Sequence, residues 1–178
     1  MDERVSARNR WIQNALGIIC LILLVVLWNN RDLPRVVKLQ RQRQYWHEAQ
    51  PAHYRMTIDN RGYRFPCPPA ILEVEGQTPL SVTALEPNFD LGPYCEAAYE
   101  DLTVDGVFSL AERYLRTHPG SVKTLEYDGE RGFITELTVI AYESALAEAV
   151  LYNSETDWDE LAPASFFIHV ESFEEVNG

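Results

Sequence analysis

Residues 53–59 read His-Tyr-Arg-Met-Thr-Ile-Asp and decide the fold class. Apolar side chains occupy every second position, at Tyr54, Met56 and Ile58, and polar side chains stand between them. Because successive side chains of a strand point to opposite faces of a sheet, this alternation predicts a strand with one buried face. The stretch that follows, residues 60–62, contains Asn and Gly and is typical of a turn.

Further strands are predicted downstream, at residues 71–75, 80–85, 122–127, 133–141 and 165–173. Between them, apolar residues recur at i, i+3, i+4 and i+7 from Val107, which predicts a helix that Thr103 or Asp105 caps. Residues 86–94 are rich in Pro and Gly and are predicted to form a loop. The segment 142–163 is ambiguous: residues 145–151 fit either a short helix or an extension of a strand, and residues 153–160 are predicted to form a polar, acidic loop. Consecutive strands with short turns indicate the α+β class, with an antiparallel sheet of about five to six strands and one or two helices on one face.

The N-terminal region contains a second strong signal. Residues 11–30 contain no charged residue, and residues 15–27 read ALGIICLILLVVL. Trp11 and Trp28 bracket this segment 17 residues apart, which is about 26 Å of helix, and tryptophan favours both membrane interfaces. The sequence therefore predicts a single-pass transmembrane anchor that contacts the lipid bilayer.

A cleaved signal peptide is the main alternative to an anchor. The residues after the apolar run, Trp28 to Asp32, offer no small side chains for a cleavage site, and Cys20 has no small residue just before it for lipidation. Both observations favour an uncleaved segment.

The orientation of the anchor rests on conflicting signals. Five basic residues follow the span within residues 31–43 and three precede it, which by itself favours a cytoplasmic C-terminal domain. That orientation would carry a tail with three arginines across the membrane, and it disagrees with the cysteine content and the resemblance described below. We therefore expect a cell-membrane protein whose C-terminal domain lies outside the cytoplasm.

Residues 31–50 are predicted to form a basic stalk helix. Asp32 can cap it, Pro34 falls in its first turn, and the apolar residues Leu33, Val36 and Val37 follow helical spacing. Its basic face fits contact with anionic lipid headgroups, or equally a solvated surface. Trp46, near the end of this helix, is expected to pack on the following domain.

Charge divides the chain into two regions. The 178-residue chain has a net charge of −12, with +5 in residues 1–43 and −17 in residues 44–178. This pattern predicts a tail at 1–10, an anchor at 11–30, a stalk at 31–50 and an acidic α+β domain at 51–178. Such an acidic domain is a poor general binder of nucleic acid, and apolar residues at 46% of the chain exclude wholesale disorder.

Several scattered positions resemble the domain-of-unknown-function family 6174. They are Trp46, Tyr54, the Cys67–Pro69 segment, Gly76, Val107-Phe108, the strand at 122–127 with Asp128, and Gly132-Phe133. The resemblance spans about residues 44–176. It implies an exported or membrane-anchored bacterial-type domain, and it implies no activity, because the family has none assigned.

Cys67 and Cys95 lie outside the predicted anchor. If the domain is exported, two such cysteines are expected to form a disulfide, which would fasten the 86–94 loop to the sheet. The alternative is a pair of reduced thiols in a cytosolic domain.

The sequence contains no recognisable set of catalytic residues. No activated nucleophile, metal-ligand spacing or phosphate loop stands out, so we expect no cofactor and no metal, and we predict that the chain is not an enzyme. Carboxylates are abundant, for example at Glu73 and Glu75, at 101–112 and at 157–160. A facing pair of them is the basis of the alternative, an envelope enzyme such as a glycan hydrolase.

Three functions therefore stay open: a domain that binds an unknown protein or envelope partner, a carboxylate-dependent enzyme, and a sensor or accessory part of a membrane complex. We favour the first. Phe89, Tyr94 and Tyr99 alternate with acidic residues and form the predicted interaction patch, because aromatic residues are favoured at the centres of interfaces. The alternative is that Phe89 and Tyr99 fill the core beneath the loop.

Overall fold

A computed structural model of the chain describes residues 17–22, 25–26, 32–62, 67–87, 89–140 and 165–176. Within these residues, no helix is both long enough and apolar enough to cross a membrane. Most of the predicted anchor at 11–30, and the whole 142–163 segment with its acidic loop, lie outside the described residues.

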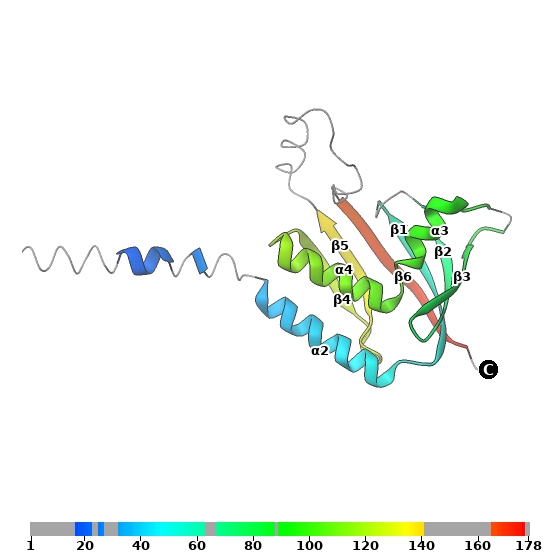
Figure 1. Cartoon of the computed structure of the whole chain (residues 1–178), viewed down its shortest axis with the longest axis horizontal. Helices are drawn as coiled ribbons and strands as arrows, with labels where there is room; N and C mark the ends of the chain where they lie inside the picture. The colour runs from blue at the N-terminus through cyan, green and yellow to red at the C-terminus, as the bar shows by residue number, and fades with distance from the viewer. Residues whose placement is uncertain are drawn as a thin grey trace, which may run out of the picture.

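The described part of the domain is a six-stranded antiparallel sheet with three helices on one face (Figure 1). The strand order is β3-β2-β1-β6-β5-β4, so the first strand pairs with the last at the centre and β3 and β4 form the edges. This confirms the predicted α+β class and antiparallel sheet. The strands are β1 His53–Arg61, β2 Ala70–Glu75, β3 Thr78–Ala84, β4 Val122–Tyr127, β5 Ile134–Ile140 and β6 Ser165–Glu175.

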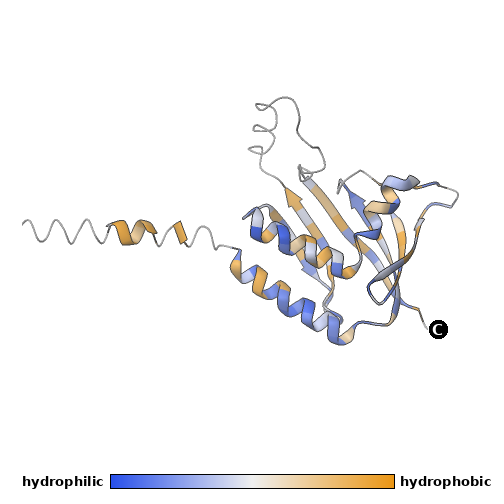
Figure 2. Ribbon diagram, viewed as in Figure 1, coloured by the Kyte–Doolittle hydropathy of each residue, from blue (hydrophilic) through white to orange (hydrophobic). Residues whose placement is uncertain are grey.

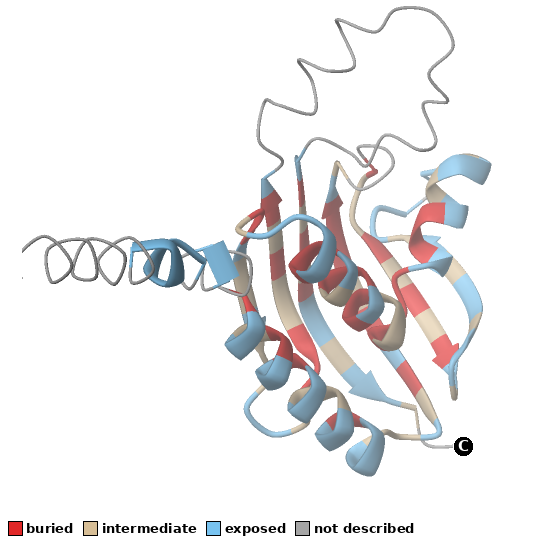
Figure 3. Cartoon of the chain, turned by 60° about the vertical axis from the view of Figure 1, so that its left-hand side comes forward, coloured by how far each residue is buried: buried red, intermediate tan, exposed pale blue. Residues whose placement is uncertain are grey.

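The alternation in β1 has the predicted result. Tyr54, Met56 and Ile58 are at most 1% exposed and face the helices, whereas Arg55 is exposed on the other face. Figure 3 shows the same alternation of buried and exposed positions along the neighbouring strands. The core therefore lies between one face of the sheet and the helices.

Helix α4, Val104–Thr117, crosses the middle of the sheet. Its buried residues follow the predicted stripe and include Val107, Leu110, Ala111 and Tyr114. Thr103 is the N-cap, since its Oγ1 accepts a hydrogen bond from the Gly106 N–H at 3.1 Å.

Helix α2, Leu33–Ala49, is part of the domain and does not stand apart from it as a stalk. Val36, Leu39 and Trp46 are buried, and the Trp46 ring packs edge-on against Tyr54 and two phenylalanines. The expected packing of Trp46 is confirmed, and Val36 and Leu39 pack into the same core. Three widely spaced apolar residues thus attach a mostly polar helix to the sheet.

The start of α2 is held by a contact other than the predicted cap. Asp32 occupies the N-cap position, yet its carboxylate makes no hydrogen bond to the helix. It accepts a hydrogen bond from the Gly120 N–H at 2.6 Å and lies 3.6 Å from Arg35. Asp32 therefore joins α2 to the turn that leads into β4.

Helix α3, Gly92–Glu100, begins inside the stretch that the sequence predicted as a loop. Gly92 adopts a positive φ of 69° and Pro93 occupies the first turn. Ala98 and Tyr99 are its buried residues, so its amphipathic pattern is too short to detect. The loop prediction is thus wrong for residues 92–94.

Candidate functional site

The predicted disulfide joins the segment before β2 to helix α3. Cys67 and Cys95 are bonded, with their Cα atoms 5.7 Å apart. Cys67 is buried and Cys95 packs against the core. The bond fastens α3 to the β2 side of the sheet, which confirms the predicted pairing, although the segment that it holds is a helix rather than a loop.

Tyr99 does not belong to an exposed patch. Its ring is fully buried under α3, and its hydroxyl donates a hydrogen bond to the Pro68 carbonyl at 2.7 Å. Burial raises the pKa of Tyr99 to about 12. The prediction is wrong for this residue because Tyr99 is the main apolar anchor of a short helix.

Phe89 and Tyr94 are exposed, as the patch prediction requires. Half of Phe89 and 72% of Tyr94 are accessible, and Leu80 and Leu85 nearby along the chain are also exposed. These four residues, Leu80, Leu85, Phe89 and Tyr94, are called the α3–β3 surface below. They come from β3, from the connection to α3 and from the first turn of α3.

The α3–β3 surface lies in a strongly acidic part of the chain. Residues 65–112 contain nine Asp and Glu residues and no Lys or Arg. In the part of the chain that the structure describes, no hydrogen bond or ion pair neutralises the carboxylates of Glu75, Glu86, Glu96 and Glu100. Among the described residues, this region therefore combines acidic side chains with exposed aromatic and aliphatic ones.

At the opposite edge of the sheet, exposed apolar side chains lie next to basic residues rather than acidic ones. Exposed Leu33 and Val37 lie on the first turns of α2, together with the basic residues Lys38 and Arg41. This group is called the α2 end below. Figure 1 shows the start of α2 on the far side of the sheet from α3 and β3.

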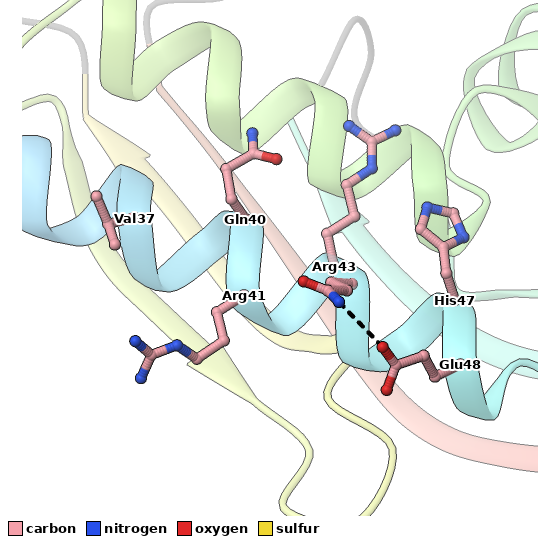
Figure 4. A pocket seen from close by; sticks show the side chains of 7 residues that line it. Val37, Gln40, Arg41, Arg43, His47 and Glu48 are labelled. Atoms are coloured by element: carbon pink, nitrogen blue, oxygen red, sulfur yellow. Dashed lines mark hydrogen bonds between the residues drawn. The ribbon is translucent and has the colours of Figure 1, made fainter.

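A charged network fastens α2 to α4. Its α2 members, Arg43 and His47, line an open groove along α2 (Figure 4). Arg43 Nε and His47 Nε2 each lie 3.3 Å from Asp105 Oδ1, and Arg43 also reaches Glu112 at 3.8 Å. Part of the basic face predicted for the stalk is thus used in contacts within the domain.

Three of the carboxylates considered for catalysis, those of Glu73, Asp105 and Glu112, are paired with basic side chains, whereas that of Glu75 has no such partner among the described residues. Glu73 accepts a hydrogen bond from Arg55 at 3.2 Å and lies 2.8 Å from His53 Nε2, and the Arg55 hydrogen bond is the main cause that lowers the pKa of Glu73. Asp105 and Glu112 belong to the network with Arg43. Residues 157–160 lie outside the described residues.

Comparison with known proteins identifies the family. The sequence profile of DUF6174, a family of unknown function, matches residues 38–156. The chain belongs to this family. The match begins within α2 and includes β1 to β5, which agrees with α2 as part of the domain. No match was found among the curated proteins or the solved structures.

In this DUF6174 chain, each of the four histidines contacts different neighbours. His169 lies on the outer face of β6, opposite Asp59 in β1 and Glu136 in β5, while Ile168 and Val170 are buried. His118 lies 2.7 Å from the hydroxyl of Thr117. Among the described residues, no group of three or more His, Cys, Asp or Glu side chains is arranged to hold a metal ion.

Sequence reasoning missed two features of the candidate site. It did not find α3, although Gly92-Pro93 could have indicated a helix start, because Pro is favoured in the first turn. It also did not identify β3 as an edge strand, because that position follows from the pairing of β1 with β6 far along the chain.

Proposed function

We propose that this DUF6174 chain is a membrane-anchored domain that lies outside the cytoplasm and binds a partner protein. One observation carries the proposal: the two ends of the domain differ in chemistry. The α2 end combines exposed apolar and basic side chains, and the α3–β3 surface combines exposed aromatic and acidic ones. The first combination suits a membrane surface and the second suits a protein.

The N-terminal residues support an anchor. The described residues 17–22 and 25–26 are helical, and their large apolar side chains are exposed, for example Ile18 at 59% and Leu21 at 64%. Figure 2 contrasts these apolar residues with the mostly hydrophilic surface of α2. Exposed side chains of this kind are stable in a lipid environment and unfavourable in water.

The α2 end supports contact with the membrane surface. α2 begins three residues after the uncharged segment 11–30, so its first turns stay close to any bilayer that this segment enters. Lysine and arginine side chains are attracted to anionic headgroups, and each basic residue near the surface contributes about 1 kcal/mol of binding free energy. Neighbouring apolar side chains bury themselves at the boundary between headgroups and acyl chains. Leu33, Val37, Lys38 and Arg41 provide that combination.

The disulfide supports a location outside the cytoplasm. Disulfides persist in oxidising compartments and are rare where thiols are kept reduced. The Cys67–Cys95 bond holds α3, which carries Tyr94, so the proposed binding surface itself depends on the bond.

A binding role is favoured over the glycan hydrolase alternative. Three of the acidic residues considered for catalysis, Glu73, Asp105 and Glu112, are engaged by arginines, and aromatic residues are exposed on the α3–β3 surface. Aromatic side chains contribute much of the binding energy in protein interfaces.

A reporter fused after Gly178 tests the location. We expect activity from a reporter that functions only outside the cytoplasm, and we expect the fusion protein in the membrane fraction after a high-salt wash. As a control, deletion of residues 11–30 should abolish both results. Activity of only a cytoplasmic reporter would contradict the proposal and would favour the orientation given by the five-to-three count of basic residues.

A further inference from the structure

The two edges of the sheet differ in how they are protected. At β4, Arg35 Nη1 donates a hydrogen bond to the Val122 carbonyl at 2.6 Å, and Arg35 Nη2 lies 3.4 Å from the Lys123 carbonyl. The strand also carries the charged residues Lys123 and Glu126. Charged side chains and covering groups are the usual means by which proteins prevent edge strands from pairing.

Within the described residues, β3 has neither a charged side chain nor a side chain bonded to its outer carbonyls. Its sequence, Thr-Pro-Leu-Ser-Val-Thr-Ala at residues 78–84, contains no charged residue. Among the described residues, the recorded hydrogen-bond partner of this strand is β2. Pro79 lacks an N–H group, but it lies at the second position, so residues 80–84 retain their donors.

The register shows which backbone groups point away from the sheet. The Leu85 N–H donates to the Pro69 carbonyl at 2.9 Å, so this pair is of the hydrogen-bonded type. Hydrogen-bonded and non-bonded pairs alternate in an antiparallel ladder, which makes Thr83 and Ser81 the next bonded residues. The N–H and C=O groups of Val82 and Ala84 consequently point outward from the edge.

The charged residues around β3 indicate what kind of segment would pair with its outer edge. Glu75 lies opposite Thr78 at one end of the strand, and Glu86 follows the other end. Helix α3, with Glu96 and Glu100, packs against β3 and β2. A second copy of this chain would bring like charges together across the edge, whereas a basic segment would be attracted to it.

From these observations we infer that β3 binds an extended, basic segment of a partner protein as a seventh strand. The backbone of the segment pairs with Val82 and Ala84, its basic side chains meet the nearby carboxylates, and its apolar side chains extend the α3–β3 surface. This inference rests on the proposed function, because it names the partner chemistry for the same end of the domain.

A blocked seven-residue peptide that alternates lysine with valine tests this inference, with the full chain in detergent micelles. We expect saturable binding and slower amide exchange at Val82 and Ala84. A peptide that alternates glutamate with valine should bind about tenfold or more weakly, because its charge is reversed. A lysine–valine peptide that is N-methylated at alternate residues should also bind about tenfold more weakly, because it keeps the side chains and loses backbone donors.

Variants at Ala84 examine the protein side of the pairing. Ala84→Pro removes an outward N–H and should weaken peptide binding about tenfold, while Ala84→Ser keeps the N–H and should leave it unchanged. The N-methylated peptide keeps the test valid if Ala84→Pro fails to fold.

Three results would overturn the inference. The first is equal binding of the unmodified and the N-methylated lysine–valine peptides. The second is no binding of the unmodified lysine–valine peptide at millimolar concentration. The third is that the chain forms a concentration-dependent dimer in which the amides of β3 are protected from exchange without any peptide. The first would leave the proposed function intact, with side-chain docking on the α3–β3 surface. The reporter experiment tests anchoring and export separately from all three.

Discussion

Replacing Trp46 by alanine is expected to lower the free energy of unfolding by about 4 kcal/mol, within the range of about 3–5 kcal/mol typical of buried tryptophans. Trp46 is fully buried, and its ring lies 5.6 Å from Tyr54, 6.0 Å from Phe133 and 5.7 Å from Phe173. The substitution would remove the group that joins α2 to β1, to β6 and to the residue that precedes β5. Urea unfolding followed by near-ultraviolet circular dichroism measures the change.

The neighbouring residue Tyr45 provides a matched control. Tyr45 is 44% exposed, and its hydroxyl donates one hydrogen bond to the Glu130 carbonyl at 2.7 Å. Tyr45→Ala should therefore cost only about 1 kcal/mol. If α2 were a separate stalk, both substitutions would leave domain stability unchanged, and that result would contradict the packing described above.

Loss of the disulfide is expected to cost about 3–4 kcal/mol, from the loop-closure entropy of a cross-link between residues 28 positions apart. A Cys67→Ser, Cys95→Ser double variant should show this loss in urea unfolding. It should also show faster amide exchange in α3 than in α4, because α3 has few other buried residues.

Cys20→Ser is the control for this second prediction, since Cys20 is an exposed free cysteine. It should leave both the unfolding midpoint and the exchange of α3 unchanged. Identical midpoints for the double variant and the parent chain would show that the disulfide does not stabilise the domain.

The elements that the sequence predicted well are those with a repeated apolar pattern. β1 alternates over three buried residues, and α4 repeats its apolar positions over three turns, so burial is directly visible in their sequences. The two cysteines were also predictable as a pair, because disulfide formation depends on compartment and cysteine count as well as on local structure.

Other features depend on distant parts of the chain. The Ser172 hydroxyl donates to Thr57 across 115 residues, within the β1–β6 pairing that places β3 at an edge. No local pattern contains that information. For Tyr99 the sequence left both a surface patch and the core beneath the loop open, and its burial lies within helix α3, which the sequence did not predict.

The central claim is that one end of the domain meets the membrane and the other meets a protein. A photoreactive residue introduced at Val37 or at Tyr94 of the chain in its native membrane tests this claim most directly. Both side chains are exposed, 54% at Val37 and 72% at Tyr94, so neither replacement disturbs the core. We predict that illumination yields lipid adducts from position 37 and a discrete protein adduct from position 94. Lipid adducts from position 94, or the same adducts from both positions, would contradict the account.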